Sequence, residues 1–386
     1  MRGHIRERSP GRWAIVLDVP GRSGKRRRKW HSFKGTKREA QVECARLLTE
    51  VSKGSYVDTS KLTVAEHVSA RVAQWEASGD ITAKTAERYS ELVENQIVPH
   101  IGAKLIQKLK PADIEAWHTT LKLSGRKDGK GGIANRTIGH AHRVLSKALR
   151  EAARHDLVVK NVAAEEGAPK PDDGEMIILS PEQLADLPSK LAGRPIRPRA
   201  VTAVYTGMRR GELLAVRWRY VDLDAKVIKV RESLEQTKKH GIRFKTTKTK
   251  SGRRDITLPD FVVETLREHR KAQLEQRIAL GLGKLEPDAL VFPADLDGGP
   301  IAPGEFSAEW RDVADSVGLQ GVPLHSLRHT HASQLIDAGV DVVTISRRLG
   351  HASPAITLKT DAHLFRKDDG KAAAAINAAL AGKPKA

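Results

Sequence analysis

Residues 325–340, HSLRHTHASQLIDAGV, are the stretch from which the rest of this 386-residue chain can be interpreted. His325 precedes Arg328 by three residues, so both side chains share one face at the start of a helix. Residues 337–350 continue as DAGVDVVTISRRLG, whose apolar spacing and Gly339 predict a second helix after a turn. Taken alone, such a helix–turn–helix pattern is typical of a DNA-reading motif.

Three other stretches accompany this one in order along the chain. They are TGMRRGELLAVRW at 206–218, KTTKTKSGRRDITLP at 245–259 and LGHASPAITLKTDAHL at 349–364. Together the four resemble the tyrosine recombinase family, the site-specific integrases of phages and mobile elements, over most of residues 176–366. The resemblance implies a mostly helical α+β catalytic domain at 176–386. It also implies that DNA strands are cut and rejoined through a 3′-phosphotyrosyl intermediate, without a metal ion, ATP or another cofactor.

By this resemblance, two arginines bind the phosphate group. Arg209 in TGMR and Arg328 in HSLR match the family positions, where each guanidinium offers a fork of donors to the non-bridging oxygens. In-line attack on a phosphodiester places negative charge on these oxygens, so fixed positive donors stabilise the transition state. Arg210 is adjacent but points elsewhere on a helix, and we interpret it as a surface or backbone contact.

The leaving 5′ oxygen needs a proton, which in this family comes from a lysine on a β-hairpin. Lys248 in TKTKSGRRDITLP matches that lysine best. Lys250 remains the alternative, because it lies two residues further on and shares the same strand face. The nearby cations Lys245, Arg253 and Arg254 are expected to position phosphate groups of the DNA.

Two histidines and a carboxylate complete the implied site. His325 assists proton transfer at the nucleophile, and His351 in LGH hydrogen-bonds the phosphate. The helix–turn–helix then serves mainly as a scaffold for His351. Glu212 follows Arg209 by three residues and is expected to orient it through an ion pair.

A metal site is the rival interpretation of the histidines in the first stretch. His325 and His329 are four residues apart, which can place two ligands on one helix face. However, His331 projects from a different side, and no carboxylate follows at ligand spacing. We therefore expect no metal, and we interpret His329 and His331 as packing or supporting groups.

Asp361 stands where the family has its nucleophilic tyrosine. Its side chain is shorter than a phenol, and its charge repels an approaching phosphate by about 1–4 kcal/mol, so cleavage is expected to be defective. Tyr205 is close to Arg209 in the sequence but lies on a preceding helix, and we do not expect it to substitute. Two interpretations stay open. The chain is either a recombinase that carries a Tyr→Asp change or a natural non-catalytic DNA-binding relative.

The N-terminal 60 residues are strongly basic, with 15 Lys and Arg against six Asp and Glu. Residues 12–19 predict a strand, 30–33 predict a returning strand, and 36–51 predict a helix with one apolar face. The resemblance identifies this small sheet with its helix as an arm-type DNA-binding domain at 1–60. Its candidate DNA contacts are Arg26, Arg27, Arg28 and Lys29.

Residues 61–165 are predicted to be all-helical, and they resemble the SAM-like core-binding domain of integrases. Thr63 and Glu66 have the spacing of a capping box. Pro99 is expected to end one helix, and Asn135 is expected to cap another.

A linker is predicted at 163–175, because AAEEGAPKPDDGE combines Pro, Gly and clustered acids. After it, Ser180, Pro181 and Gln183 have the spacing that begins a helix.

Composition limits the class of partner. A net charge of +20 favours double-stranded DNA, of core and arm type, over a membrane surface, since the sequence has no lipidation motif and no strongly amphipathic basic helix. No apolar run is long enough to span a bilayer. The single cysteine excludes an internal disulfide framework and a cysteine-built zinc site. The N-terminus lacks a signal peptide, so we expect a cytoplasmic, DNA-associated protein of a bacterial host or phage. The resemblance implies a homotetramer on DNA, with possible accessory DNA-bending or directionality proteins.

Overall fold

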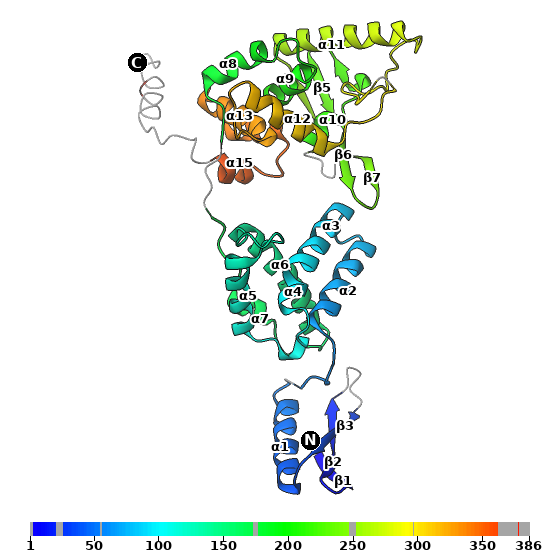
Figure 1. Ribbon diagram of the computed structural model, residues 1–386, viewed down its shortest axis with the longest axis vertical. Coiled ribbons are helices and arrows are strands. Elements are labelled where there is room, and N and C mark those ends of the chain that lie inside the picture. Colours follow the sequence, from blue (N-terminus) through cyan, green and yellow to red (C-terminus); the bar gives the residue numbers. More distant parts are fainter. Residues whose placement is uncertain are drawn as a thin grey trace, which may run out of the picture. The chain divides into compact units, whose positions relative to one another are not determined.

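The computed structural model describes residues 3–20, 26–54, 56–172, 177–246, 252–295, 297–361 and 377. The chain divides into two compact units, Met1–Asp173 and Gly174–Ala386, which Figure 1 colours along the sequence. None of the described helices combines the length and the apolar character needed to cross a bilayer.

The first unit begins with an antiparallel sheet of three strands. In the order β1–β2–β3, the strands span Gly3–Ser9, Arg12–Pro20 and Arg26–Lys34. The predicted strand and its returning partner are both confirmed. Strand β1 has no counterpart in the sequence prediction, because Ile5 is its only large apolar residue and backbone pairing to β2 holds it in place.

Helix α1 (Lys37–Ser52) covers one face of this sheet (Figure 1). Thr36 and Glu39 form a reciprocal capping box, in which the Glu39 carboxylate accepts from the Thr36 backbone N–H at 2.7 Å. The predicted apolar face of the helix is confirmed. Its buried residues pack on those of β2, and the main members of this small core are Ile15, Leu17, Val19, Cys44, Leu47 and Val51.

A bundle of helices follows. Its longer members are α2 (Val64–Ala77), α3 (Ala83–Leu92), α5 (Pro111–Ser124) and α6 (Asn135–Arg154). The predicted capping box of Thr63 and Glu66 begins α2. Trp75 and Trp117 are almost completely buried in the bundle core, and each indole N–H reaches a protein oxygen. The all-helical character predicted for this region is confirmed.

Two local predictions in the bundle are wrong. The third helix does not end at Pro99, because a π-helical turn (Val93–Ile97) leads into α4 (Val98–Ile101). Pro99 then lies in the first turn of α4, where a missing N–H needs no partner. Asn135 is the first residue of α6 and not its cap. Its backbone N–H and its side-chain amide donate to the carboxylate of Asp172, at 3.2 and 2.8 Å.

The short helix α7 (Val162–Glu166) packs against α5 and α6. The predicted linker at 163–175 therefore begins inside a helix, and regular structure stops after Glu166. Next to α7, His118 Nε2 and His142 Nδ1 lie 3.1 Å apart and join α5 to α6. Burial lowers the pKa of His142 to about 4, so its ring is neutral at pH 7.

We expect His142 to make the first unit sensitive to acid. The pKa of His142 is about 4 in the folded chain and has the ordinary histidine value of 6.5 in the unfolded chain, so between these values the unfolded chain binds the additional proton. The stabilisation is complete above about pH 6.5 and is lost as the pH falls toward 4, by roughly 3 kcal/mol at most. Urea unfolding at pH 7.5 and 4.5 should show a smaller loss for H142N than for the unmodified chain. Equal losses would contradict this expectation.

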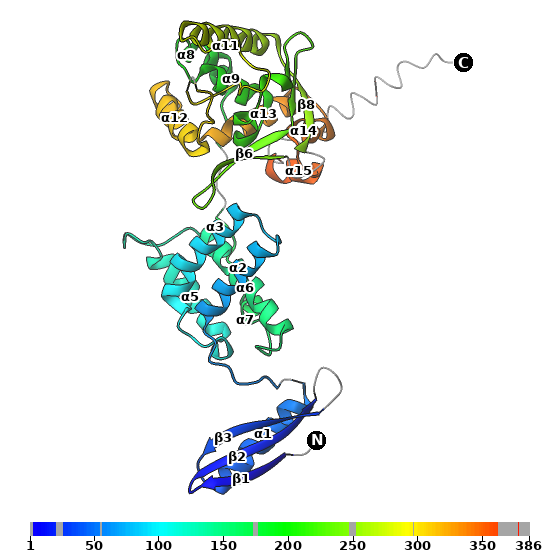
Figure 2. The ribbon, with the colours of Figure 1, turned by 90° about the vertical axis from the view of Figure 1, so that its right-hand side faces the viewer.

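The second unit is mostly helical. Its helices are α8 (Pro181–Lys190), α9 (Arg197–Thr206), α10 (Arg210–Leu214), α11 (Asp260–Ala279), α12 (Pro303–Ser316), α13 (Leu324–Asp337), α14 (Val342–Leu349) and α15 (Pro354–Asp361). An antiparallel sheet has the order β4 (Val221–Asp222), β5 (Val227–Val230) and β8 (Arg254–Thr257). The separate hairpin of β6 (Glu232–Thr237) and β7 (Gly241–Thr246) is inserted in the sequence between β5 and β8 (Figure 2). The predicted α+β class is confirmed.

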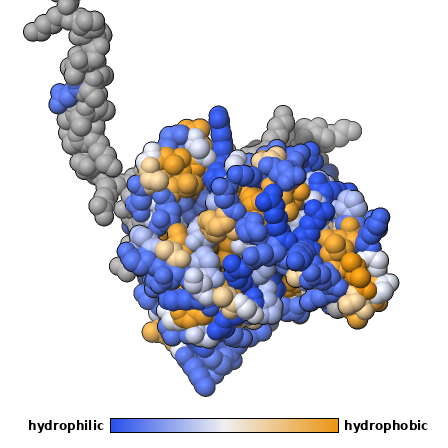
Figure 3. Space-filling model, turned by 90° about the horizontal axis from the view of Figure 1, so that it is seen from above, coloured by the Kyte–Doolittle hydropathy of each residue, from blue (hydrophilic) through white to orange (hydrophobic). Residues whose placement is uncertain are grey.

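Apolar side chains of this unit are mostly internal. Phe306 and Trp310 of α12 are completely buried in a core that reaches the sheet and the neighbouring helices. Seen from the end that carries α11, the surface is largely hydrophilic, with several separate apolar patches (Figure 3). Ser180, Pro181 and Gln183 begin α8 as predicted.

The predicted helix–turn–helix is confirmed. Helix α13 ends at Asp337, Gly339 adopts a φ of +77°, and the Asp341 carboxylate caps α14. Gly350, with a φ of +67°, ends α14 in the left-handed conformation. This turn directs the C-terminal carbonyls of α14 toward the predicted site residues.

Candidate active site

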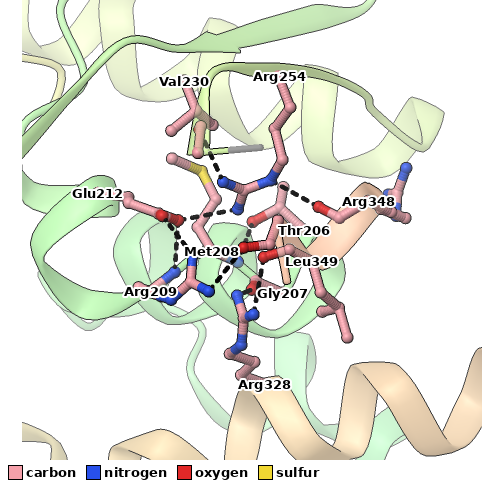
Figure 4. Close-up of polar contacts among 12 residues, drawn as sticks. Thr206, Gly207, Met208, Arg209, Glu212, Val230, Arg254, Arg328, Arg348 and Leu349 are labelled. Carbon is pink, nitrogen blue, oxygen red and sulfur yellow. Dashed lines mark hydrogen bonds and ion pairs between the residues drawn. The ribbon is translucent and has the colours of Figure 1, made fainter. Parts of the chain in front are cut away.

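The C-terminal end of α14 is the point where Arg209, Arg254 and Arg328 meet (Figure 4). The backbone carbonyls of residues 348–350 each accept a hydrogen bond from a different arginine. The Arg348 carbonyl accepts from Arg254 Nε at 2.6 Å, and the Leu349 carbonyl accepts from Arg328 Nη2 at 2.7 Å. The Gly350 carbonyl accepts from Arg209 Nη2 at 2.8 Å. Terminal carbonyls of a helix carry partial negative charge and lack partners within the helix, so they stabilise the three guanidinium groups.

The carboxylate of Glu212 connects two of these arginines, Arg209 and Arg254. One carboxylate oxygen accepts from Arg209 Nη1 and the other from Arg254 Nη2, both at 2.8 Å. The Glu212 side chain is only 4% exposed, whereas that of Arg209 is 42% exposed. Burial opposes ionisation of Glu212, but Arg254 and Arg209 outweigh it and hold the pKa of the carboxyl below its ordinary value. This contact agrees with the orienting role expected for Glu212.

Arg328 is buried beneath the turn that carries Arg209. Its Nη1 donates to the Gly207 carbonyl at 2.5 Å, which links the start of α13 to the end of α9. Gly207 has a φ of +64°, and a Cβ there would approach His331 and Leu349 to 2.7 Å. A larger residue is therefore excluded at 207, which explains the glycine of the TGMR motif.

The two predicted histidines differ in their surroundings. His325 is exposed at the start of α13, yet partial desolvation, His329 and the nearby guanidinium groups lower its pKa to about 4. Its ring is therefore neutral near pH 7 and can accept a proton. His351 follows α14, and its Nδ1 lies 2.8 Å from the hydroxyl of the buried Thr357, which fixes the ring orientation.

Arg254 does not have the position that the sequence predicts. Its side chain is 7% exposed, and its three nitrogens bond to Arg348, Gly252 and Glu212. The structure therefore places Arg254 among the groups that hold Glu212 and the end of α14, and not on the exposed surface where a contact with DNA phosphate was expected. Arg210 is exposed and donates to the Ser307 hydroxyl at 2.5 Å, apart from the cluster.

The remaining predicted cations belong to residues 245–253 of the sequence. Lys248 and Lys250 fall outside the described residues, which stop at Thr246 and resume at Gly252, so the general acid stays a prediction. Lys245 is ion-paired with Glu235, and Arg253 is exposed.

Asp361 is the last residue of α15, and only its backbone is described. Helix α15 contacts α13 and α14, and it contains Thr357, the partner of His351. Tyr205 donates its hydroxyl to the Leu184 carbonyl at 2.8 Å, and its ring packs edge-on against Phe261. That phenol is therefore directed away from the arginine cluster, in agreement with the expectation that it does not substitute.

The histidines of α13 do not gather as a metal site. The described residues contain no group of three or more His, Cys, Asp or Glu placed to hold a metal. His331 is buried and accepts a hydrogen bond from Arg348 Nε at 2.9 Å, and burial lowers its pKa to about 3. His325 and His329 pack edge to face, with ring centroids 4.7 Å apart.

The four basic residues predicted to contact DNA from the N-terminal sheet are not equivalent. Side chains alternate along β3, so Arg28 projects from the face opposite α1, whereas Arg27 and Lys29 project from the α1 side. Lys29 is ion-paired with Asp58 at 2.5 Å, and Arg28 Nε lies 3.6 Å from the carboxylate of Asp18. Of Arg26, only the backbone is described.

Two basic surfaces escape the sequence analysis. On the outer face of the sheet, Arg6 and Arg8 of β1 accompany Arg28, and Arg8 lies 5.6 Å from the ring of Trp30, which is 55% exposed. The alternation in HIRER is the signal that could have found them. On α6, a second row has a spacing of seven residues and is exposed; its members are Arg136, Arg143 and Arg150.

Comparison with known families identifies this site. The family model described as "Phage integrase family" matches residues 178–367, and that of the "Phage integrase, N-terminal SAM-like domain" matches residues 70–122. The chain belongs to the phage integrase family. This tyrosine recombinase family performs site-specific recombination, and the arginine cluster of this integrase lies inside the matched region.

Curated relatives of this integrase span nearly its whole length. A "Tyrosine recombinase XerC-like" protein of Caldanaerobacter subterraneus subsp. tengcongensis is 25% identical and covers 89% of this chain and 90% of its own. An integrase of Streptomyces ambofaciens is 28% identical over 87% of this chain and 84% of its own.

Solved structures share the fold. The Tn1549 transposon integrase, solved with transposon right-end DNA, has a TM-score of 0.67 at 20% identity and covers 83% of this chain and 100% of its own. A lambda integrase dimer bound to a core site has a TM-score of 0.55 at 18% identity and covers 94% of each chain.

Proposed function

We propose that this integrase binds the scissile phosphate of a DNA attachment site between Arg209, Arg328 and His351. The observation that supports this most is the convergence of both arginines on successive carbonyls beside His351. Their guanidinium groups are pre-oriented before DNA arrives, so little reorganisation is needed as charge develops on the phosphate. Covalent capture of DNA by an Asp361→Tyr chain tests the proposal.

The proposed reaction is strand cleavage and rejoining through a 3′-phosphotyrosyl intermediate, independent of metal and ATP. His325, neutral near pH 7, accepts the proton of the attacking hydroxyl. Lys248, with Lys250 as the alternative, donates a proton to the leaving 5′ oxygen. The bond energy is kept in the phosphodiester link to the protein, so rejoining requires no further energy source.

As written, the chain holds the phosphodiester but does not cut it, because Asp361 replaces the nucleophile. The intact arginine cluster supports a recombinase with a Tyr→Asp change more strongly than a natural non-catalytic relative. A relative that only binds DNA has no need for Glu212 to orient a phosphate-binding arginine from a buried position. That second candidate predicts DNA binding with no gain of cleavage on restoring tyrosine.

Three DNA-binding parts are proposed. They are an arm-type domain at 1–60, a core-binding domain at 61–165 and the catalytic domain at 176–386. The outer face of the N-terminal sheet supplies Arg6, Arg8 and Arg28 to arm-type DNA, and α6 supplies Arg136, Arg143 and Arg150 to core DNA. Recombination joins two DNA sites, so we propose a homotetramer on DNA that acts in the cytoplasm of a bacterial host, with possible accessory proteins.

Removing the outer-face cations should weaken DNA binding and its dependence on salt. Each phosphate contact adds close to one unit to the slope of log K against log salt, so R6A/R28A should lower this slope by about two. Titration of a fluorescent duplex between 50 and 200 mM salt measures this. The control is R46A on α1, whose side chain is ion-paired with Glu43 and Glu50. If R46A lowers the slope equally, the outer face is not the binding surface.

A further inference from the structure

Arg254 of β8 is a buried arginine that the proposed reaction does not use. Its Nε donates to the Arg348 carbonyl at 2.6 Å, its Nη1 to the Gly252 carbonyl at 3.3 Å, and its Nη2 to Glu212 at 2.8 Å. Only Glu212 among these partners carries a formal negative charge that a cation requires. Because Arg209 already occupies the other oxygen of Glu212, Arg254 is a second guanidinium on one carboxylate.

Arg209 and Arg254 share the carboxylate of Glu212, and this determines the orientation of the Arg209 guanidinium. Arg209 gives Nη1 to Glu212 and Nη2 to the Gly350 carbonyl, so its guanidinium spans the carboxylate and the turn before His351. A carboxylate without a second cation binds an arginine through both of its oxygens, in the bidentate geometry. Arg254 Nη2 opposes that arrangement, because it donates to the second oxygen of Glu212, which also accepts from the Arg209 backbone N–H at 3.0 Å.

We infer that Arg254 is a positioning residue, which holds Arg209 in the phosphate-binding orientation by taking one oxygen of Glu212 and anchoring the end of α14. This inference rests on the proposed function, since it assumes that Arg209 binds phosphate. Arg254 itself touches neither phosphate nor the reacting atoms. Two of its contacts, to Arg348 and to Glu212, join β8 to α14 and to α10, the elements that carry or flank Glu212, Arg209 and His351.

The fold does not depend on Arg254 alone. Arg348 makes the reciprocal connection from α14 to β8, where its Nη2 donates to the Thr257 carbonyl at 3.1 Å. The same side chain bonds to His331 of α13 and to the Tyr205 carbonyl of α9. Loss of the Arg254 guanidinium should therefore leave α14 in place while Glu212 draws Arg209 Nη2 away from Gly350.

The first test measures phosphate binding in the full chain with Asp361 unchanged. Inorganic phosphate is titrated into the unmodified chain, R254Q, R254K and R231Q, and the ring NMR signals of His351 and His325 are followed. Arg231 is a control for loss of a neighbouring guanidinium, because its side chain bonds to Asp255 at 2.6 Å and to the backbone carbonyls of Val230 and Arg254. R231Q therefore removes a contact to the backbone at position 254 and leaves the contact of the Arg254 side chain with Glu212 in place. Thermal unfolding of each variant confirms that it is folded.

We expect R254Q to weaken phosphate binding about tenfold and R231Q to leave it within about twofold, since a displaced charge-assisted hydrogen bond has an effect of this size. R254K should not restore binding, because a lysine ammonium is a point charge and cannot bridge partners as the planar fork does. Equal binding by R254Q and R231Q would overturn the inference, as would full binding by R254K.

The second test separates this inference from the proposed function. In the Asp361→Tyr chain, R254Q should slow covalent capture of nicked DNA about 100-fold without changing the half-saturating DNA concentration, because a small misplacement of a catalytic group has that effect on rate. If phosphate leaves the His351 signals of the unmodified chain unchanged, the phosphate site fails and the role of Arg254 fails with it. If the unmodified chain binds phosphate but R254Q and R231Q bind it equally well, the role of Arg254 fails and the proposed phosphate site stands.

Discussion

Replacing Asp361 with tyrosine should convert a chain that forms no covalent DNA adduct into one that does. The phenol supplies a hydroxyl at position 361, while Arg209, Arg328 and His351 already lie together at the end of α14, where we propose that the phosphate binds. Because the carboxylate is too short and repels the phosphate, we expect the adduct yield to rise from background by at least about 10³-fold. A pool of nicked duplexes of random sequence serves as substrate, and SDS-resistant adducts are counted on a gel.

One control variant defines this result. D361F restores the aromatic ring without the hydroxyl and should stay at background. If the Asp361→Tyr chain also stays at background on a pool that it binds, the recombinase proposal is contradicted and the non-catalytic relative is favoured. The codon at position 361 in the source gene is a test that does not depend on these assays. Asp and Tyr codons differ by one base, and a Tyr codon in the gene would exclude the natural non-catalytic relative.

Removal of Arg209 should have the second largest effect. In the Asp361→Tyr chain, R209A eliminates a forked donor to the non-bridging oxygens, and loss of one such donor costs about 10²- to 10³-fold in rate. Its side chain is 42% exposed, so the fold should tolerate the change better than it tolerates loss of the buried Arg328. Single-turnover adduct formation measures the rate.

The neighbouring Arg210 provides the matched control for R209A. It has the same charge and an adjacent position, but it donates to Ser307 and not to the cluster. R210A should therefore retain the rate within about threefold, since a surface contact contributes little. Equal losses in R209A and R210A would mean that net positive charge matters and the geometry of Arg209 does not.

The sequence predicts the elements whose signals are local. Capping boxes at Thr63 and Ser180, the turn at Gly339 and the apolar face of α1 depend on residues a few positions apart, and all are present in the structure. The order and spacing of the four motifs also bring Arg209, Arg328 and His351 together at one place.

Features that depend on long-range contacts are not predictable in this way. The cap of α6 is completed by Asp172, 37 residues from Asn135. Strand β1 exists because β2 offers it backbone partners. The sequence predicts Arg254 to be one of several surface cations. Only the tertiary fold shows that its side chain is buried, in contact with Glu212 and with the end of α14.

The most direct test of the account is to identify the bond that captures DNA in the Asp361→Tyr chain. Digestion of the adduct followed by mass spectrometry locates the modified residue and the DNA end attached to it. We expect a 3′-phosphate linked to the tyrosine introduced at position 361. Attachment at any other residue, or through a 5′ end, would contradict it.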